Sequence, residues 1–265
     1  MKKLILCIGL IAILLPVMIF TGCIRKNAEE AAGALTTKTY DYTGFTGVDI
    51  GSAMKLELSY GTEYSVAVTA GENLFKHLHV DKNGDTLKIY TDGWSINWWW
   101  NNTTPKVVIT MPTLEKLYIS GASHGTVTGF KSGTALKLHA SGASDLDMDI
   151  QTGMFTTEIS GASNVKGQLT ATGTDINISG ASDINLTGTG GDFKMISSGA
   201  SSSSLRYYVV NDADVQLSGA SDGSLNISGT LNADLSGAST FNYYGAPKMG
   251  HISVTGASNL RDKTN

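Results

Sequence analysis

Apolar and polar residues alternate through most of residues 114–262, and one four-residue motif interrupts the alternation at a regular interval. Consecutive copies of this motif, Ser-Gly-Ala-Ser with one final Thr-Gly-Ala-Ser, start 18 to 21 residues apart. A period near 19 is too short for two packed helices per repeat, and it is typical of one coil of a β-solenoid. The eight copies start at Ser120, Ser141, Ser160, Ser179, Ser198, Ser218, Ser236 and Thr255.

The residues on both sides of each motif predict two strands. Successive side chains of a strand point to opposite faces, so the positions one and three before the motif should face inward. The position between them is mostly polar and should face water. The first row is Ile119, Ala140, Ile159, Ile178, Ser197, Leu217, Leu235 and Val254, and the second is Leu117, Leu138, Thr157, Ile176, Met195, Val215, Ala233 and Ile252. After the motif, the inward residues are Leu146, Val165, Ile184, Phe241 and Leu260, followed two positions on by Met148, Leu186, Leu205, Leu225 and Tyr243.

Each repeat therefore consists of a strand, a Gly-Ala corner and a second strand. Glycine supplies a backbone conformation that other residues reach only with strain, and we expect the small alanine to tuck into the bend. No single coil could bury its apolar row alone, so the core exists only as a stack. We predict an all-β fold, a right-handed parallel β-helix with about 19 residues per coil.

Residues 43–113 show strand patterns without the motif and should form an N-terminal β region that caps the first coil. Asn83-Gly84 between two of these strands is a hairpin signal. At the other end, residues 259–265 offer only a thin cap, and 263–265 form a short tail. The five strands are predicted at Met54–Tyr60, Tyr64–Ala70, His77–Val80, Thr86–Thr91 and Lys106–Met111.

The first residues are typical of an export signal: two lysines, an apolar run over residues 4–20, and a Thr-Gly-Cys ending. This ending resembles the lipobox of bacterial lipoproteins, in which the cysteine is lipidated, so Cys23 is the expected lipidation site. Residues 1–22 would then be the signal peptide and 23–42 a polar tether to the bilayer. A retained signal anchor is the alternative, although the run is shorter than a spanning helix needs.

The composition and the net charge limit the classes of partner that the chain can bind. Charged residues make up 16% of the chain, the 31 glycines are well above average usage, and the net charge is −4. Nucleic acid is an unsuitable partner because there is no basic excess to neutralise phosphates. Cys7 lies in the predicted signal peptide, so lipidation of Cys23 would leave no cysteine for a disulfide.

The corner motifs and the segments before them resemble the GIN domain family, described as head domains of auto-transporter adhesins. The likeness covers about residues 43–262, including Phe45-Thr46-Gly47-Val48 and Met111-Pro112-Thr113-Leu114-Glu115-Lys116-Leu117. It implies an exported envelope protein with a parallel β-helix, here a lipid-anchored member. The resemblance implies no catalytic residues.

The four tryptophans crowd one segment and form the candidate glycan-binding site. Indole faces stack on sugar rings and amides bind hydroxyls, which suits saccharide contact. The alternatives are that the indoles cap the solenoid end, or that they contact the membrane or a protein. The candidate residues are Trp94, Trp98, Trp99, Trp100 and Asn101.

The other polar groups give only weak evidence for a metal-binding or catalytic site. The residue after each motif, such as Asp145, suits hydrogen bonding to its own turn, and single aspartates on separate rungs do not converge on calcium. Alternation places Asp145, Asp147 and Asp149 on one face, like the carboxylates of polysaccharide-cleaving β-helices, but no general acid is identifiable. His77 and His79 share a strand face without a further ligand. His139 and Glu158 should be neighbours on adjacent rungs of the outward row and form a surface pair. We therefore expect no metal, no cofactor and no catalytic residues.

The sequence favours a non-catalytic, extracytoplasmic lipoprotein anchored in the outer membrane or at the cell surface. Its hydroxyl-rich solenoid face would contact polysaccharide or an envelope protein through many weak contacts. A structural spacer that oligomerises through the solenoid end is the second hypothesis. A polysaccharide-cleaving enzyme is the third.

Overall fold

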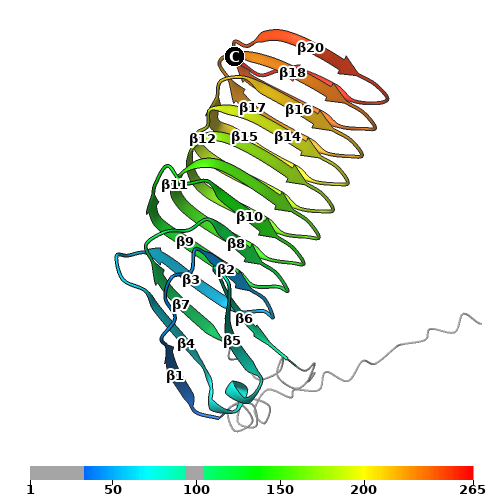
Figure 1. The fold of residues 1–265 in the computed structure, drawn as a ribbon. Helices are drawn as coiled ribbons and strands as arrows, with labels where there is room; N and C mark the ends of the chain where they lie inside the picture. The colour runs from blue at the N-terminus through cyan, green and yellow to red at the C-terminus, as the bar shows by residue number, and fades with distance from the viewer. Residues whose placement is uncertain (1–32, 93–103, 265) are drawn as a thin grey trace, which may run out of the picture.

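The computed structural model of the protein describes residues 33–92 and 104–264. It is an all-β solenoid of about eight turns with about 19 residues per turn, preceded by an antiparallel β region, which confirms the predicted fold class. In Figure 1 the strands lie one above another like rungs, from the blue and cyan strands at the N-terminal end to the orange and red strands at the other.

Each coil supplies one strand before its corner and one after it, which gives two stacked rows of strands. The pre-corner row contains β8 (Lys116–Ile119), β10 (Leu136–Ala140), β14 (Asp192–Ser197), β16 (Ala213–Leu217), β18 (Thr230–Leu235) and β20 (Lys248–Val254). The post-corner row contains β9 (His124–Lys131), β13 (Asp183–Thr189), β15 (Ser202–Val210), β17 (Asp222–Ile227), β19 (Thr240–Gly245) and β21 (Asn259–Asp262). Two longer strands, β11 (Asp145–Ile159) and β12 (Asn164–Ile178), begin after one corner and continue without a break to the next corner, so they belong to both rows.

The coils stack in parallel register. Ile159 of β11 pairs with Ile178 of β12, and Ile178 pairs with Ser197 of β14. Equivalent positions of consecutive repeats therefore lie side by side, about 4.8 Å apart. The parallel stacking required by the repeat interpretation is confirmed.

The predicted inward rows form the core. Ile119, Ile159 and Ile178 are at most 1% exposed. The two polar members of these rows, Thr157 and Ser197, are also buried, and Ser197 Oγ lies 2.7 Å from Ser201 Oγ. Side-chain alternation predicts burial even where the residue is polar, because the strand geometry leaves it no other face.

The N-terminal region adds antiparallel strands to the end of the stack. β4 (Ser65–Gly71) pairs antiparallel with β1 (Leu35–Tyr40) and with β7 (Lys106–Met111), and a short 3-10 helix, η1 (Glu72–Lys76), follows β4. The segment 35–40 thus forms an edge strand, whereas the sequence predicted a tether there. Its threonine-rich alternation suits a strand once β4 offers a hydrogen-bonding edge.

The predicted hairpin is confirmed. β5 (Leu78–Asn83) and β6 (Thr86–Thr91) pair antiparallel around Gly84, which has a φ of +59°. The structure starts β5 one residue after the predicted boundary and extends it through Asn83, because the pairing continues up to the turn.

Parallel stacking begins before the first motif. β2 (Gly47–Ile50) pairs with β8 and β6, and β3 (Lys55–Tyr60) pairs with β9 and β7, all in parallel. Residues 51–54 between β2 and β3 form a corner in which Met54 is fully buried. The sequence Gly-Ser-Ala-Met therefore acts as a divergent copy of the motif.

The last coil continues the inward rows but stays exposed. Met249, Ile252 and Val254 are 42%, 37% and 43% exposed, whereas their partners in β18 are at most 1% exposed. The expected burial of Ile252 and Val254 is therefore wrong, because no further rung covers them among residues 33–92 and 104–264. In the same described residues, no helix combines the length and apolar character needed to cross a bilayer.

Candidate binding surfaces of the solenoid

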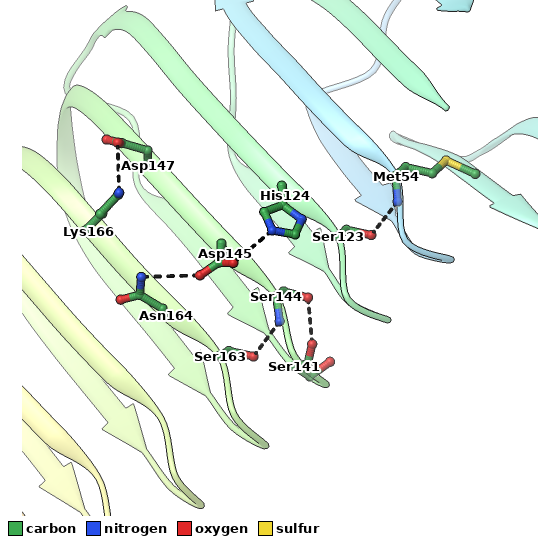
Figure 2. A network of polar contacts seen from close by, with 10 residues as sticks. All are labelled: Met54, Ser123, His124, Ser141, Ser144, Asp145, Asp147, Ser163, Asn164 and Lys166. Carbon is green, nitrogen blue, oxygen red and sulfur yellow. Dashed lines mark hydrogen bonds and ion pairs between the residues drawn. The ribbon is translucent and has the colours of Figure 1, made fainter. Parts of the chain in front are cut away.

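The second serine of the first seven motifs is buried, and its hydroxyl forms hydrogen bonds with the backbone. Ser163 Oγ donates to the carbonyl of Ser160 at 2.9 Å. It accepts from the N–H of Ser144 at 3.4 Å, and Figure 2 draws this second contact. Met54 N–H reaches Ser123 Oγ in the same way at 3.2 Å. Buried hydroxyls satisfied in this way stabilise the stack and leave no group free for a ligand. The corner serines are Ser123, Ser144, Ser163, Ser182, Ser201, Ser221 and Ser239.

The corner alanine does not tuck into the bend. Ala143, Ala162 and Ala181 are exposed, and it is the serine that points inward. The expectation for alanine is wrong because the preceding glycine takes a positive φ, which turns the Gly-Ala step outward. The Ala181 N–H instead donates to the carbonyl of Gly161, one rung earlier, at 2.8 Å.

The residues that follow the motifs form one aligned row across the post-corner strands, which we call the Asp145 column. His124 Nε2 lies 3.1 Å from Asp145 Oδ2, within ion-pairing distance, and Asn164 Nδ2 donates to Asp145 Oδ1 at 3.3 Å, each from a neighbouring rung (Figure 2). The prediction that such residues bond their own turn is wrong for Asp145, although Asn259 does bond the Ala257 carbonyl. The column comprises His124, Asp145, Asn164, Asp183, Ser202, Asp222, Thr240 and Asn259.

Asp145, Asp147 and Asp149 do share the outward face of β11, as the alternation predicts. The structure adds a lysine that the sequence interpretation missed: Lys166 Nζ lies 3.7 Å from Asp147 Oδ2, on the next rung. The repeat period could have found it, since position 166 follows position 147 by one coil.

On the pre-corner face, the predicted pairing of His139 with Glu158 is confirmed. His139 Nδ1 lies 3.1 Å from Glu158 Oε2, and Lys137 Nζ lies 3.9 Å from Glu158 Oε1. These side chains are about half exposed, so the pair is an ordinary surface interaction.

His77 and His79 both contact Asp92. His79 Nε2 lies 2.7 Å from Asp92 Oδ2, and His77 Nδ1 lies 3.3 Å from Asp92 Oδ1. The hydrogen bond from His79, reinforced by His77, holds the pKa of Asp92 below its usual range. Across residues 33–92 and 104–264, no group of three or more His, Cys, Asp or Glu side chains is arranged to hold a metal ion.

The carboxyl groups with a shifted pKa all shift downward, each beside a hydrogen-bond donor. The hydrogen bond from Lys106 lowers the pKa of Glu57, and that from Lys116 lowers the pKa of Asp85. A general acid needs a raised pKa instead. Glu57 and Asp85 form surface ion pairs with these two lysines.

The tryptophan candidates and the lipidation site lie outside the described residues. Trp94, Trp98, Trp99, Trp100 and Asn101 fall between β6 and β7, and Cys23 precedes residue 33. Both therefore stay predictions. The candidate binding surfaces among the described residues are the two outward faces of the solenoid.

Comparison with protein families gives one match. Residues 44–247 match the family described as "Putative auto-transporter adhesin, head GIN domain". No protein with a curated description matches the chain.

Several solved structures share the fold. A "putative adhesin" from Parabacteroides merdae superposes with a TM-score of 0.79 at 17% identity, covering 87% of this chain and 96% of that one. A "putative lipid binding protein" from Parabacteroides distasonis gives 0.73 at 16% identity, covering 86% and 97%. A "putative adhesin" from Bacteroides fragilis gives 0.65 at 19% identity, covering 86% and 97%. At these identities the likeness establishes the fold alone.

Proposed function

Because the chain belongs to the GIN domain family of auto-transporter adhesin heads, we propose that it is a non-catalytic adhesin-type lipoprotein of the cell envelope. Lipidated Cys23 anchors it in the outer membrane or at the cell surface. The solenoid then presents its outward faces to surface polysaccharide or to an envelope protein.

The Asp145 column is the observation that carries this proposal. Eight side chains able to hydrogen bond repeat in register along a rigid ladder, at the rung spacing of about 4.8 Å. Such a surface suits an extended partner held by many weak contacts better than a small molecule held in one pocket. Glycan contact by the tryptophan segment would add to the same surface function.

Labelled palmitate tests the anchor. The wild-type chain should incorporate the label and sediment with membranes, whereas Cys23→Ala should incorporate none. Cys7→Ala is the matched control, because Cys7 lies within the predicted signal peptide. Equal labelling of wild type and Cys23→Ala would contradict lipidation at this residue.

A glycan array tests the tryptophan segment. The chain from residue 24 should bind surface saccharides, and a variant with Trp98→Ala, Trp99→Ala and Trp100→Ala should bind more weakly. Leu35→Ala is the control, because it removes an apolar side chain that is 65% exposed on β1. Unchanged binding by the tryptophan variant would assign contact to other residues, and no binding by wild type would refute glycan recognition.

The exposed last coil favours a second candidate function, a spacer that assembles through the solenoid end. Met249, Ile252 and Val254 would be buried if another rung stacked on β20. Sedimentation should then show oligomers that Ile252→Lys disperses. Met154→Lys is the control, since Met154 is 41% exposed on β11, away from this end. A wild-type chain that stays monomeric at high concentration would refute the spacer.

A further inference from the structure

One rung of the post-corner face departs from the regular ladder. Between β15 and β17 the pairing runs from Leu205 with Leu225 directly to Val209 with Asn226. Three residues of β15 therefore have no partner on β17 and form a bulge. Bulges commonly redirect side chains next to functional sites.

The bulge is anchored from inside by its third residue. Tyr208 is fully buried, and its hydroxyl lies 2.8 Å from Thr174 Oγ1. A Cβ on Gly190 would meet the Tyr208 hydroxyl at 2.7 Å, so the neighbouring coil leaves room for this ring only by carrying a glycine there. The packing fixes the bulge in place and turns the two preceding residues outward.

Those two residues form an exposed platform with a third from β19. Tyr207 is 68% exposed, and the Arg206 guanidinium carbon lies 5.4 Å from the centre of its ring. The same guanidinium lies 4.8 Å from the ring centre of Tyr244, which is two strands away, beyond β17. The Arg206 guanidinium thus contacts two aromatic rings, and these contacts hold the planar group in a defined position.

Arg206 has no acidic partner in the part of the chain that the structure describes. Among the described residues, no carboxylate lies within ion-pairing distance of the Arg206 guanidinium. In contrast, most of the ion pairs found on the solenoid faces join side chains of neighbouring rungs. Asn226 pairs with both Val209 and Tyr244 in the ladder and carries an outward amide beside the platform. Within the described residues, the unpaired guanidinium and the exposed Tyr207 ring therefore lie beside the half-buried side chains of Tyr244 and Asn226.

We propose that Arg206, Tyr207, Tyr244 and Asn226 bind a saccharide unit that carries an anionic group, a carboxylate or a phosphate. The guanidinium fork binds the anion through paired hydrogen bonds, the tyrosine rings stack on the apolar face of the sugar ring, and Asn226 binds a hydroxyl. This inference rests on the proposed surface-binding function and names its ligand class and one of its sites.

A saccharide fits these groups better than a protein partner does. Among the residues that the structure describes, Val209 is the exposed aliphatic residue beside the platform, at 39%, which is little apolar area for a protein interface core. Along β13, the neighbouring outward residues include Asn185 and Thr187, which offer further amide and hydroxyl groups. A polymer chain lying across the rungs could therefore use contacts beyond the platform.

Matched probes test the proposal on the chain from residue 24, which keeps every described residue. Calorimetry or surface plasmon resonance should show binding of oligogalacturonate or phosphomannan, with weaker binding of methyl-esterified oligogalacturonate or unphosphorylated mannan. Arg206→Gln should weaken binding of the anionic probe by about tenfold, and added salt should weaken wild-type binding. Tyr207→Ala should weaken it by a similar factor. Lys194→Gln is the matched control, because it removes an exposed cation from β14 on the other face.

The outcomes separate this site from the broader function. If the anionic probes bind and Arg206→Gln binds them equally well, the platform is refuted while the surface-binding function stands. If the binding is lost only in the tryptophan variant, the site lies in that segment instead. Loss of binding to an envelope protein in Arg206→Gln, with unchanged saccharide binding, would make the platform a protein contact and overturn the proposal. If wild type binds no saccharide, charged or neutral, both the platform and glycan recognition fail.

Discussion

The corner glycines give the sharpest test of how the coils stack. Gly180 has a φ of +76°, and a Cβ built on it would meet the carbonyl oxygen of Gly161, one rung earlier, at 2.5 Å. That carbonyl also accepts the hydrogen bond from the Ala181 N–H, so it cannot move without weakening the ladder. Gly180→Ala therefore combines an unfavourable backbone conformation with a backbone clash.

Two other glycines separate these contributions. Gly84 also has a positive φ, +59°, but a Cβ there would meet nothing within 4 Å, and Gly133 has open space and no positive φ. The left-handed conformation costs about 1–2 kcal/mol for a residue with a Cβ. Overpacking adds about 1–3 kcal/mol. We expect Gly180→Ala to lower the free energy of unfolding by about 3 kcal/mol and Gly84→Ala by about 1 kcal/mol.

Gly133→Ala should be neutral or stabilise the fold by up to about 1 kcal/mol, because alanine restricts the unfolded chain. Urea unfolding of the chain from residue 24, followed by circular dichroism, measures all three variants under the same conditions. If Gly180→Ala is no more destabilising than Gly84→Ala, the close approach of consecutive corners is refuted.

Three further predictions concern the core, the bulge and the surface. Ile178→Ala should lower the free energy of unfolding by about 2–5 kcal/mol, because Ile178 is fully buried between neighbouring rungs, and urea unfolding measures it. Tyr208→Phe should cost about 1–3 kcal/mol, since it leaves the buried Thr174 hydroxyl without its partner; a change below 0.5 kcal/mol would contradict that hydrogen bond. Lys106 Nζ lies 2.8 Å from Glu57 Oε2, and its hydrogen bond lowers the pKa of Glu57. The contribution of this pair to stability is therefore present above the ordinary carboxyl pKa and is lost as the pH falls through the lowered pKa. Carboxyl NMR titration should show the pKa of Glu57 rising in Lys106→Met, and an unchanged pKa would contradict the pairing.

The period and the alternation together predicted the solenoid, because both follow directly from strand geometry. They placed Ile119, Ile159 and Ile178 in the core, and they also placed the polar Ser197 there. Pairing of His139 with Glu158 followed from the same period. The burial of strand positions could therefore be predicted from the repeat, whereas the outward direction of the corner alanine could not, because it depends on the positive φ of the preceding glycine.

Features that break the repeat were missed. The coil formed by β2 and β3 has a corner without the motif, and β1 depends on the edge that β4 offers, so neither has a periodic signal. The bulge in β15 did leave a trace, since the motif spacings around it are 20 and 18 residues, but which side chains it turns outward depends on the burial of Tyr208. The corner serine, identical in all eight motifs while the next residue varies, was a signal for a structural hydroxyl.

Distances between exposed corner residues test the parallel stack most directly. Ala143, Ala220, Ala238 and Ala257 are exposed and occupy equivalent corner positions, and the chain from residue 24 contains no cysteine. Spin labels on cysteines at Ala143 and at one of the other three positions can be measured by double electron–electron resonance. The stack predicts a distance of about 19 Å between positions 143 and 220, which are four rungs apart. The distance should increase by about 4.8 Å with each further rung. Distances that stay constant or fail to increase in order would contradict the solenoid.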